Sequence, residues 1–209
     1  MEYRAVGNRC AVDIPALKFP VPAEKALSIL IDKGFKIIEV DLLSLARECI
    51  GKSRYQRGVH PDLAPDVVDC SSFMKWLYAQ RGIWLPRRSI QQRAMGQTIE
   101  LNGISPGDLV FVSGRIDYFV DDPSAGVGHV GLATETQTVI HAANKRAGVV
   151  ETPLDRFISE FEFRGARRLI PKKRHVMTLE IPKQRCVETS DDIKWIILQS
   201  LPVPAPRPS

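Results

Sequence analysis

The cysteines are the first residues of this 209-residue chain that could perform chemistry. The chain has four of them, at Cys10, Cys49, Cys70 and Cys186. They lie far apart and form no Cys-x-x-Cys pair, which favours free thiols over a disulfide framework. Cys70 follows Asp69, a good helix N-cap, and precedes an apolar run, so we expect it in the first turn of a helix. Backbone N–H groups and the helix dipole favour a thiolate there, which makes Cys70 a candidate nucleophile; the alternative is a small core residue.

The chain has four histidines, and two of them could serve as the base for this thiol. His60 precedes a proline in a polar loop and His175 lies in a basic stretch, so we expect both to be exposed. His129 opens one apolar strand, at residues 129–133, and His141 lies near the end of another, at 138–142. An imidazole can take a proton from a thiol near neutral pH, and a second polar group can orient it.

We predict that these two strands form an antiparallel hairpin with His129 opposite His141. Gly131 would then face Val139, and the loop would be centred on Glu135. Residues opposite one another share a face of the sheet, so the two imidazoles would lie about 5 Å apart at Cβ. The alternatives are two unrelated strand histidines, or a zinc site of Cys70, His129 and His141. Zinc is disfavoured because no carboxylate base is clearly signalled beside them.

The remaining pattern predicts helices followed by antiparallel strands. We expect helices at 23–33, at 41–50 and from Cys70 to about residue 81, and strands at 35–40, 109–112, 129–133, 138–142 and 162–170. This order indicates an α+β fold. The predicted organisation is a lead-in segment at 1–40, a domain at 41–170 and an extension at 171–209. Residues 201–209 form a proline-rich tail for which we expect no packing role.

Composition limits the classes of function. The net charge is +5, with 44% hydrophobic and 25% charged residues, as in a globular protein. No basic run is interleaved with aromatic residues, so we predict no nucleic-acid partner. We see neither a signal peptide nor an apolar run of membrane-spanning length, and therefore expect a cytoplasmic location. Export by a non-standard route or delivery by a phage stays open, as does the oligomeric state.

An ordered set of segments resembles the NlpC (p-sixty) family of cell-wall cysteine peptidases. The resemblance extends from about residue 40 to 169. Its segments are Gly51–Gly58 with Tyr55; Asp69-Cys70-Ser71 with Phe73; Gly82-Ile83, Leu85-Pro86-Arg87, Ser89 and Gln92; Pro106–Phe111; Gly128–Leu132; and Val139–Ala142. Six segments that agree in order are a specific signal.

The resemblance implies a papain-like α+β core with helices packed on an antiparallel sheet. It implies Cys70 as nucleophile, His129 as base and His141 as the orienting residue of a triad. The implied substrate is a peptidoglycan stem peptide, cut between D-glutamate and a diamino acid through a thioester. Tyr55, Asp69 and Ser71 would line the pocket for one end of that peptide; their alternatives are a packing aromatic, an N-cap and a first-turn residue. We predict no cofactor and no metal ion.

Two departures from the family pattern bear on the site. Ser72 stands where the family commonly has glycine, and we expect its side chain to narrow the approach to the nucleophile. Residues 112–127 are a longer segment than usual, expected to be a solvated loop beside the cleft that could shape specificity. Two other functions stay open: the same triad acting on a non-wall amide or ester, as in an effector, and a non-catalytic binder of peptidoglycan or of a partner protein.

Overall fold

The computed structural model describes residues 2–202, which form two compact units. The central unit comprises Asp41–Gln80 and Leu85–Lys173. The terminal unit combines both ends of the chain, up to Val40 and from Arg174 onward, with Arg81–Trp84. The predicted organisation has the two ends of the chain as separate segments, and their packing into one unit was not predicted. Of the predicted proline-rich tail, residues 203–209 lie outside the part that the structure describes.

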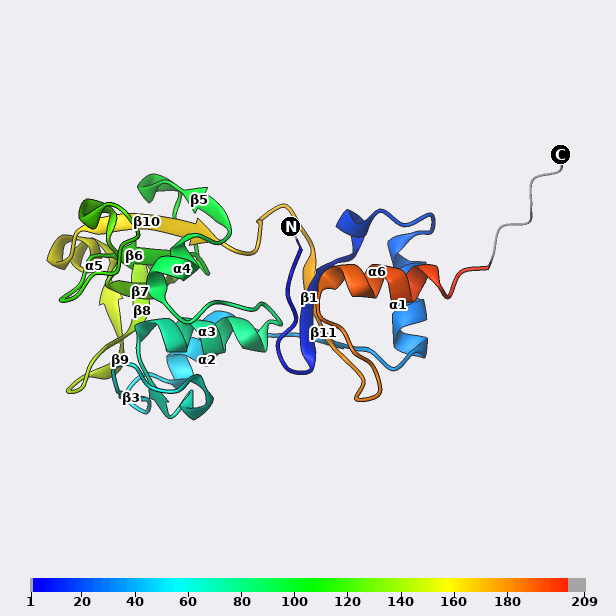
Figure 1. Cartoon of the computed structure of the whole chain (residues 1–209), viewed down its shortest axis with the longest axis horizontal. Coiled ribbons are helices and arrows are strands. Elements are labelled where there is room, and N and C mark those ends of the chain that lie inside the picture. Colours follow the sequence, from blue (N-terminus) through cyan, green and yellow to red (C-terminus); the bar gives the residue numbers. More distant parts are fainter. Residues whose placement is uncertain (1, 203–209) are drawn as a thin grey trace. The chain divides into compact units, whose positions relative to one another are not determined.

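The central unit is built on a six-stranded antiparallel sheet (Figure 1). Its spatial order is β5 (Gln97–Ile99), β10 (Phe163–Arg168), β6 (Leu109–Val112), β7 (His129–Ala133), β8 (Thr138–Asn144) and β9 (Gly148–Pro153). A separate parallel pair is formed by β3 (Arg54–Tyr55) and β4 (Val67–Val68). The apolar runs predicted as β6, β7 and β8 begin at the predicted residues, because each is bounded by turn-forming or polar residues.

Two helices of the central unit, α2 (Leu42–Glu48) and α3 (Cys70–Gln80), begin at a side-chain cap. Asp41 accepts hydrogen bonds from the first-turn N–H groups of α2, and Asp69 accepts one from the first turn of α3. The α3 helix packs against β7 and β8. The four α-helices are α2 (Leu42–Glu48), α3 (Cys70–Gln80), α4 (Ser89–Arg93) and α5 (Leu154–Glu160), and short 3₁₀ turns lie at Pro61–Leu63, Leu101–Gly103 and Pro123–Ala125. Helices combined with an antiparallel sheet confirm the predicted α+β class.

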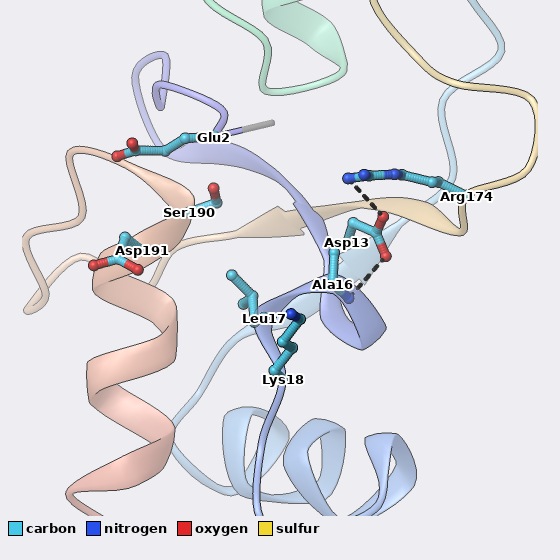
Figure 2. Close-up of a pocket in the computed structure, with 8 residues that line it drawn as sticks. All are labelled: Glu2, Asp13, Ala16, Leu17, Lys18, Arg174, Ser190 and Asp191. Carbon is cyan, nitrogen blue, oxygen red and sulfur yellow. Dashed lines mark hydrogen bonds and ion pairs between the residues drawn. The ribbon is translucent and has the colours of Figure 1, made fainter.

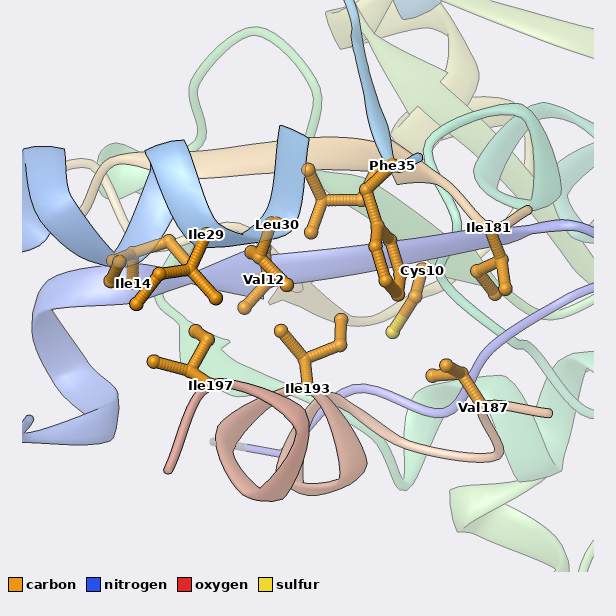
Figure 3. Packing of buried hydrophobic residues seen from close by; sticks show 12 residues of the cluster. Cys10, Val12, Ile14, Ile29, Leu30, Phe35, Ile181, Val187, Ile193 and Ile197 are labelled. Atoms are coloured by element: carbon orange, nitrogen blue, oxygen red, sulfur yellow. The ribbon is translucent and has the colours of Figure 1, made fainter. Parts of the chain in front are cut away.

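The terminal unit has a three-stranded antiparallel sheet in the order β1, β11, β2, with a helix from each end of the chain. Its elements are β1 (Arg9–Asp13), a 3₁₀ turn at Ile14–Leu17, α1 (Ala23–Asp32), β2 (Lys36–Ile38), β11 (Val176–Glu180) and α6 (Ser190–Leu198). Figure 3 shows Cys10, Val12 and Phe35 facing Ile193 and Ile197 of α6. Leu201 packs against this core, so the prediction that the tail has no packing role was wrong at this residue.

A pocket of about 360 Å³ lies in the terminal unit (Figure 2). Its lining carries charges of both signs, and Arg174 pairs with Asp13 at 3.6 Å. The lining residues are Glu2, Asp13, Ala16, Leu17, Lys18, Arg174, Ser190 and Asp191. None of the predicted site residues is among them. Within residues 2–202, no helix has the length and apolar character needed to cross a membrane.

Candidate active site

Cys70 is the first residue of α3, and a reciprocal cap closes this end of the helix. The carboxylate of Asp69 accepts a hydrogen bond from the backbone N–H of Ser72 at 2.8 Å, and the Ser72 hydroxyl accepts one from the backbone N–H of Asp69 at 2.8 Å. Ser72 is fully buried. Its hydroxyl therefore closes the cap, and the expectation that it narrows the approach to the nucleophile stays a prediction.

The thiol of Cys70 is buried and lies against the start of β7. Burial, and after it the charge of Asp69, raises the pKa of this thiol to about 12, although hydrogen bonds from the backbone N–H groups of Val130 and Ser71 act in the opposite direction. The resting group is therefore a protonated thiol, which would need a base to remove its proton before it could act as a nucleophile. Because Val130 directly follows His129, the sulfur lies beside the strand that carries the predicted base.

The two predicted histidines are in direct contact. His129 Nε2 lies 2.8 Å from His141 Nδ1, and His141 Nε2 lies 2.9 Å from the Thr152 hydroxyl. Nδ1 of His129 is the ring nitrogen left to receive a proton from Cys70. For that nitrogen to be a base, Nε2–H must donate to His141, and His141 must then donate to Thr152. This chain of hydrogen bonds favours one tautomer and one orientation of the His129 ring.

The register of the β7–β8 hairpin differs from the prediction by two residues. Leu132 pairs with Ile140, which places Gly131 opposite His141 and sets His129 diagonally from it. A shift of two residues leaves every side chain on its original face. The imidazoles therefore still meet, although they are not directly opposite one another as predicted.

The loop of this hairpin accounts for the shift. It is centred on Thr136 rather than Glu135, and the backbone N–H of Thr134 donates to the carbonyl of Thr138 at 2.9 Å. The Thr136 hydroxyl lies 3.0 Å from that of Thr134 and 3.2 Å from that of Thr138. Hydroxyl contacts of this kind stabilise a particular loop and are not encoded in the alternation of apolar residues.

Two phenylalanines surround the histidine pair. Phe157 of α5 lies 5.6 Å from His129 and 4.8 Å from His141 between ring centroids, and Phe161 lies 6.0 Å from His129. Burial, followed by the charge of His141, lowers the pKa of His129 to about 3, and burial lowers the pKa of His141 to about 4. At neutral pH both rings are therefore neutral, and the resting site holds a thiol and two imidazoles.

Asp69 and Ser71, predicted to bind substrate, lie in a buried network with Arg87. Arg87 donates to the two carboxylate oxygens of Asp69 at 3.0 and 2.5 Å and to the Ser71 hydroxyl at 2.9 Å. The backbone N–H of Gly58 also donates to Asp69 at 3.0 Å. Burial alone would raise the pKa of Asp69, but the hydrogen bonds and the charge of Arg87 hold it below its usual value. The carboxylate is thus ionised and fixed in place.

Tyr55, the third predicted substrate residue, is half-buried on β3. It pairs with Val68, two residues before Cys70. Burial raises the pKa of Tyr55, and the charges of Cys70 and Asp69 raise it further. All six predicted site residues therefore belong to one region of the central unit.

Sequence reasoning missed the roles of Arg87 and Thr152. The available signal for Arg87 was its place directly after the apolar run at 83–86, because a charge in such a place needs a partner. Thr152 offered no local signal, since its contact with His141 depends on the pairing of β8 with β9. Both nitrogens of His141 are engaged, and in the part of the chain that the structure describes no three His, Cys, Asp or Glu side chains are grouped as metal ligands.

Comparison with known proteins identifies the family. A sequence model described as the NlpC/P60 family matches residues 52–168, which is more than half of the chain. The chain belongs to the NlpC/P60 family. The match contains all six predicted site residues and excludes both ends of the chain, so the NlpC/P60 domain lies almost wholly in the central unit.

Individual relatives resemble the NlpC/P60 domain over part of their length. A probable endopeptidase from Corynebacterium glutamicum is 35% identical over 92 residues, which cover 44% of this chain and 38% of the relative. A gamma-D-glutamyl-L-lysine dipeptidyl-peptidase from Bacillus cereus is 32% identical over 104 residues, or 49% of this chain and 29% of the relative. The solved structure of NlpC1 from Trichomonas vaginalis superposes with a TM-score of 0.52 at 26% identity, and covers 63% of this chain and 44% of that one. This chain thus spans less than half the length of each.

Proposed function

We propose that this protein is a cysteine peptidase that hydrolyses amide bonds in the stem peptides of peptidoglycan. The observation that carries the proposal is a buried thiol at the start of α3 that accepts a hydrogen bond from the N–H of Val130. Val130 directly follows His129, whose Nε2 contacts a second histidine. A thiol next to an oriented imidazole is the arrangement used for nucleophilic attack on a carbonyl. Family membership and the names of the relatives support the substrate class.

In the proposed first step, His129 Nδ1 takes the proton from Cys70 as the sulfur attacks the amide carbonyl carbon. The electron pair of the C=O bond moves to oxygen, and backbone N–H groups at the start of α3, that of Cys70 first, stabilise the oxyanion. When the C–N bond breaks, His129 gives its proton to the leaving amine and a thioester remains. His141, held by Thr152, stabilises the imidazolium that exists between these transfers.

In the second step, His129 takes a proton from water, which attacks the thioester and releases the carboxylate product. Sγ leaves as thiolate and recovers its proton from His129. Since the resting thiol and imidazole are both neutral, we propose that proton transfer accompanies attack, with no preformed ion pair.

We propose the bond between D-glutamate and a diamino acid as the site of cleavage, a choice supported by the name of the Bacillus cereus relative. Tyr55 and Ser71 would contact one end of the peptide. Asp69, already paired with Arg87, would act mainly by keeping Ser71 and the start of α3 in position.

The test is incubation of the protein with defined tri- and tetrapeptide stems, followed by mass analysis of the products. The matched control is Cys70→Ala, which keeps the helix start and removes the nucleophile. We expect two fragments that correspond to a cut after D-glutamate, and none with Cys70→Ala. Cleavage only of unrelated amides or esters would replace the substrate class, and cleavage by Cys70→Ala would exclude the mechanism.

A further inference from the structure

Two arginines of the central unit meet at one tyrosine hydroxyl. Arg57, two residues after β3, donates to the Tyr118 hydroxyl at 3.3 Å, and Arg88, directly before α4, donates to the same oxygen at 3.1 Å. The guanidinium of Arg88 also lies over the Tyr118 ring, 5.0 Å from its centroid. Both arginines are exposed to solvent. Three segments distant in sequence thus bring two positive charges to one point.

Neither arginine has a carboxylate partner within residues 2–202, although acidic residues are close in sequence to Tyr118. Asp117 accepts a hydrogen bond from the backbone N–H of Gly114 at 2.7 Å, and Asp122 caps the 3₁₀ turn at Pro123–Ala125. Asp121 is exposed and forms no ion pair in that part of the chain. The positive charge at Tyr118 is therefore not neutralised by these acids.

This point in the structure favours a negative charge. The hydrogen bond from Arg57, together with the charge of Arg88, lowers the pKa of the Tyr118 phenol. Two guanidinium groups repel one another, and a neutral phenol oxygen offsets that repulsion only in part. A carboxylate would accept paired hydrogen bonds from such groups, which are stronger than those to a neutral acceptor.

Arg57 lies near the proposed nucleophile, because the N–H of the next residue, Gly58, donates to Asp69, which directly precedes Cys70. The hydrogen bond to Tyr118 raises the pKa of Arg57, and the charges of Tyr55 and Cys70 raise it further. Tyr118 forms two backbone hydrogen bonds with Val127, at 3.1 and 2.9 Å. Val127 lies two residues before His129, the proposed base. A group bound by the arginines would therefore lie within electrostatic range of the nucleophile.

We propose that Arg57 and Arg88, held together by the Tyr118 hydroxyl, form a binding site for a carboxylate of the peptide substrate beside the bond that Cys70 attacks. The ligand class is an acidic peptide with a free carboxylate near the scissile amide. The inference rests on the proposed function and adds to it a preference for stems in which that carboxylate is not amidated.

The test compares a stem peptide that has free carboxylates with the same peptide amidated at the α-carboxylate of D-glutamate, or at the carboxylate of the diamino acid. Affinity is measured by calorimetry with Cys70→Ala protein, and cleavage with the unaltered protein. We expect one amidation to weaken binding about tenfold or more. Arg57→Gln and Arg88→Gln should each weaken binding of the free-carboxylate peptide about tenfold, and change binding of that amidated form less than about twofold.

The matched control is Arg146→Gln, which removes an equal charge from an exposed position in the turn after β8. It should leave both affinities and the cleavage rate unchanged, and circular dichroism should show the same fold for all variants. Tyr118→Phe should weaken the preference for the free carboxylate by a smaller factor, because it removes only the shared acceptor.

The outcomes separate this inference from the proposed function. Equal binding of free and amidated peptides, or equal losses for both peptides in the arginine variants, overturns the carboxylate site even if cleavage is normal. Selective binding of the free carboxylate without any cleavage supports the site and contradicts the proposed function. Equal weakening by Arg146→Gln would show a general effect of charge and overturn the inference.

Discussion

Cys10 of the terminal unit and Cys70 of the central unit are both buried thiols whose pKa is raised to about 12, mainly by burial. Their surroundings differ. The sulfur of Cys10 lies 3.4 Å from the carbonyl oxygen of Ala11 and 4.0 Å from that of Tyr3, two groups that cannot take a proton. Cys70 lies beside backbone N–H groups and the strand of His129. Burial and pKa alone therefore do not distinguish the proposed nucleophile from a core residue; the neighbouring groups do.

The cores of the two units also differ in the polarity of their buried side chains. The core of the terminal unit around Cys10 is formed by aliphatic side chains and Phe35. In the central unit, one face of the sheet holds two neutral imidazoles and a threonine hydroxyl beside Phe157. Buried polar groups are tolerated only when they are hydrogen-bonded, and here each one is bonded to the next.

The largest expected effect concerns the two cysteines. Cys70→Ser should lower kcat on stem peptides by a factor of about 10⁴ or more, because the hydroxyl is a poorer nucleophile in this site. Cys10→Ala should leave kcat unchanged and lower the free energy of unfolding by about 1–2 kcal/mol. Kinetics and urea unfolding check both. A large loss of kcat in Cys10→Ala would remove the distinction between the two thiols.

The next effect concerns the chain of hydrogen bonds behind His129. His141→Ala should lower kcat about 100-fold, since it removes the group that orients the base. Thr152→Val should lower kcat about tenfold at nearly constant KM, because one hydrogen bond is lost at constant shape. Thr98→Val, on the exposed side of β5, is the matched control. Equal kinetics for the two threonine variants would contradict the positioning role of Thr152.

Alanine substitutions at Gly82 and Gly131 test the comparison of the two units through the free energy of unfolding. A Cβ at Gly82 of the terminal unit would lie 2.6 Å from the backbone carbon of Cys10, and its φ is +69°. A Cβ at Gly131 would lie 2.3 Å from a methyl of Val139 and 3.1 Å from Cβ of His141. Gly82→Ala should lower the free energy of unfolding by about 2–3 kcal/mol, because backbone cannot move aside easily.

Gly131→Ala should lower the free energy of unfolding less, by about 1–2 kcal/mol, because the Val139 side chain can rotate. It should also lower kcat, because the added methyl group displaces His141. Urea unfolding together with kinetics separates the two variants. A fully active Gly131→Ala protein would show that the close approach of β7 and β8 has no part in placing the histidines.

The dependence of stability on pH tests the buried histidines and thiols of the two units. His129 and His141 have pKa values of about 3 and 4 in the folded protein, below the value of about 6.5 in the unfolded chain. Between these values the unfolded state binds more protons, so stability rises with pH and is lost as the pH falls below about 6.5. Each histidine contributes at most about 1.4 kcal/mol per pH unit in that window.

At high pH the sign reverses for the thiols. Cys10 and Cys70 have raised pKa values, so the unfolded chain loses its protons first and stability falls as the pH rises above about 9. Urea unfolding from pH 4 to 10 should show a plateau between these limits. In His141→Ala the free energy of unfolding should fall less steeply as the pH drops below about 6.5. An unchanged slope in that variant would mean that the histidine pair does not cause this loss of stability.

Much of the fold could be predicted because its signals are local. Asp41 and Asp69 precede apolar helical patterns and cap the helices that follow. The bounds of β6 agree with the predicted 109–112, since a short apolar run follows a Pro-Gly turn. The register of β7 with β8 was wrong by two residues because threonine hydroxyls in the loop decide it. The packing together of the two chain ends was missed because strand pairing across more than 160 residues leaves no periodic signal nearby.

The sequence by itself determined which groups could react: a cysteine after a capping aspartate, and two histidines on apolar strands, in an order typical of one family. Only the tertiary structure decided that Thr152 completes the histidine chain, that Arg87 holds Asp69, and that Arg57 and Arg88 meet at Tyr118. The physical reason is distance along the chain. Capping and periodicity act over a few residues, whereas these contacts join segments that approach one another only after the strands have paired and the loops have closed.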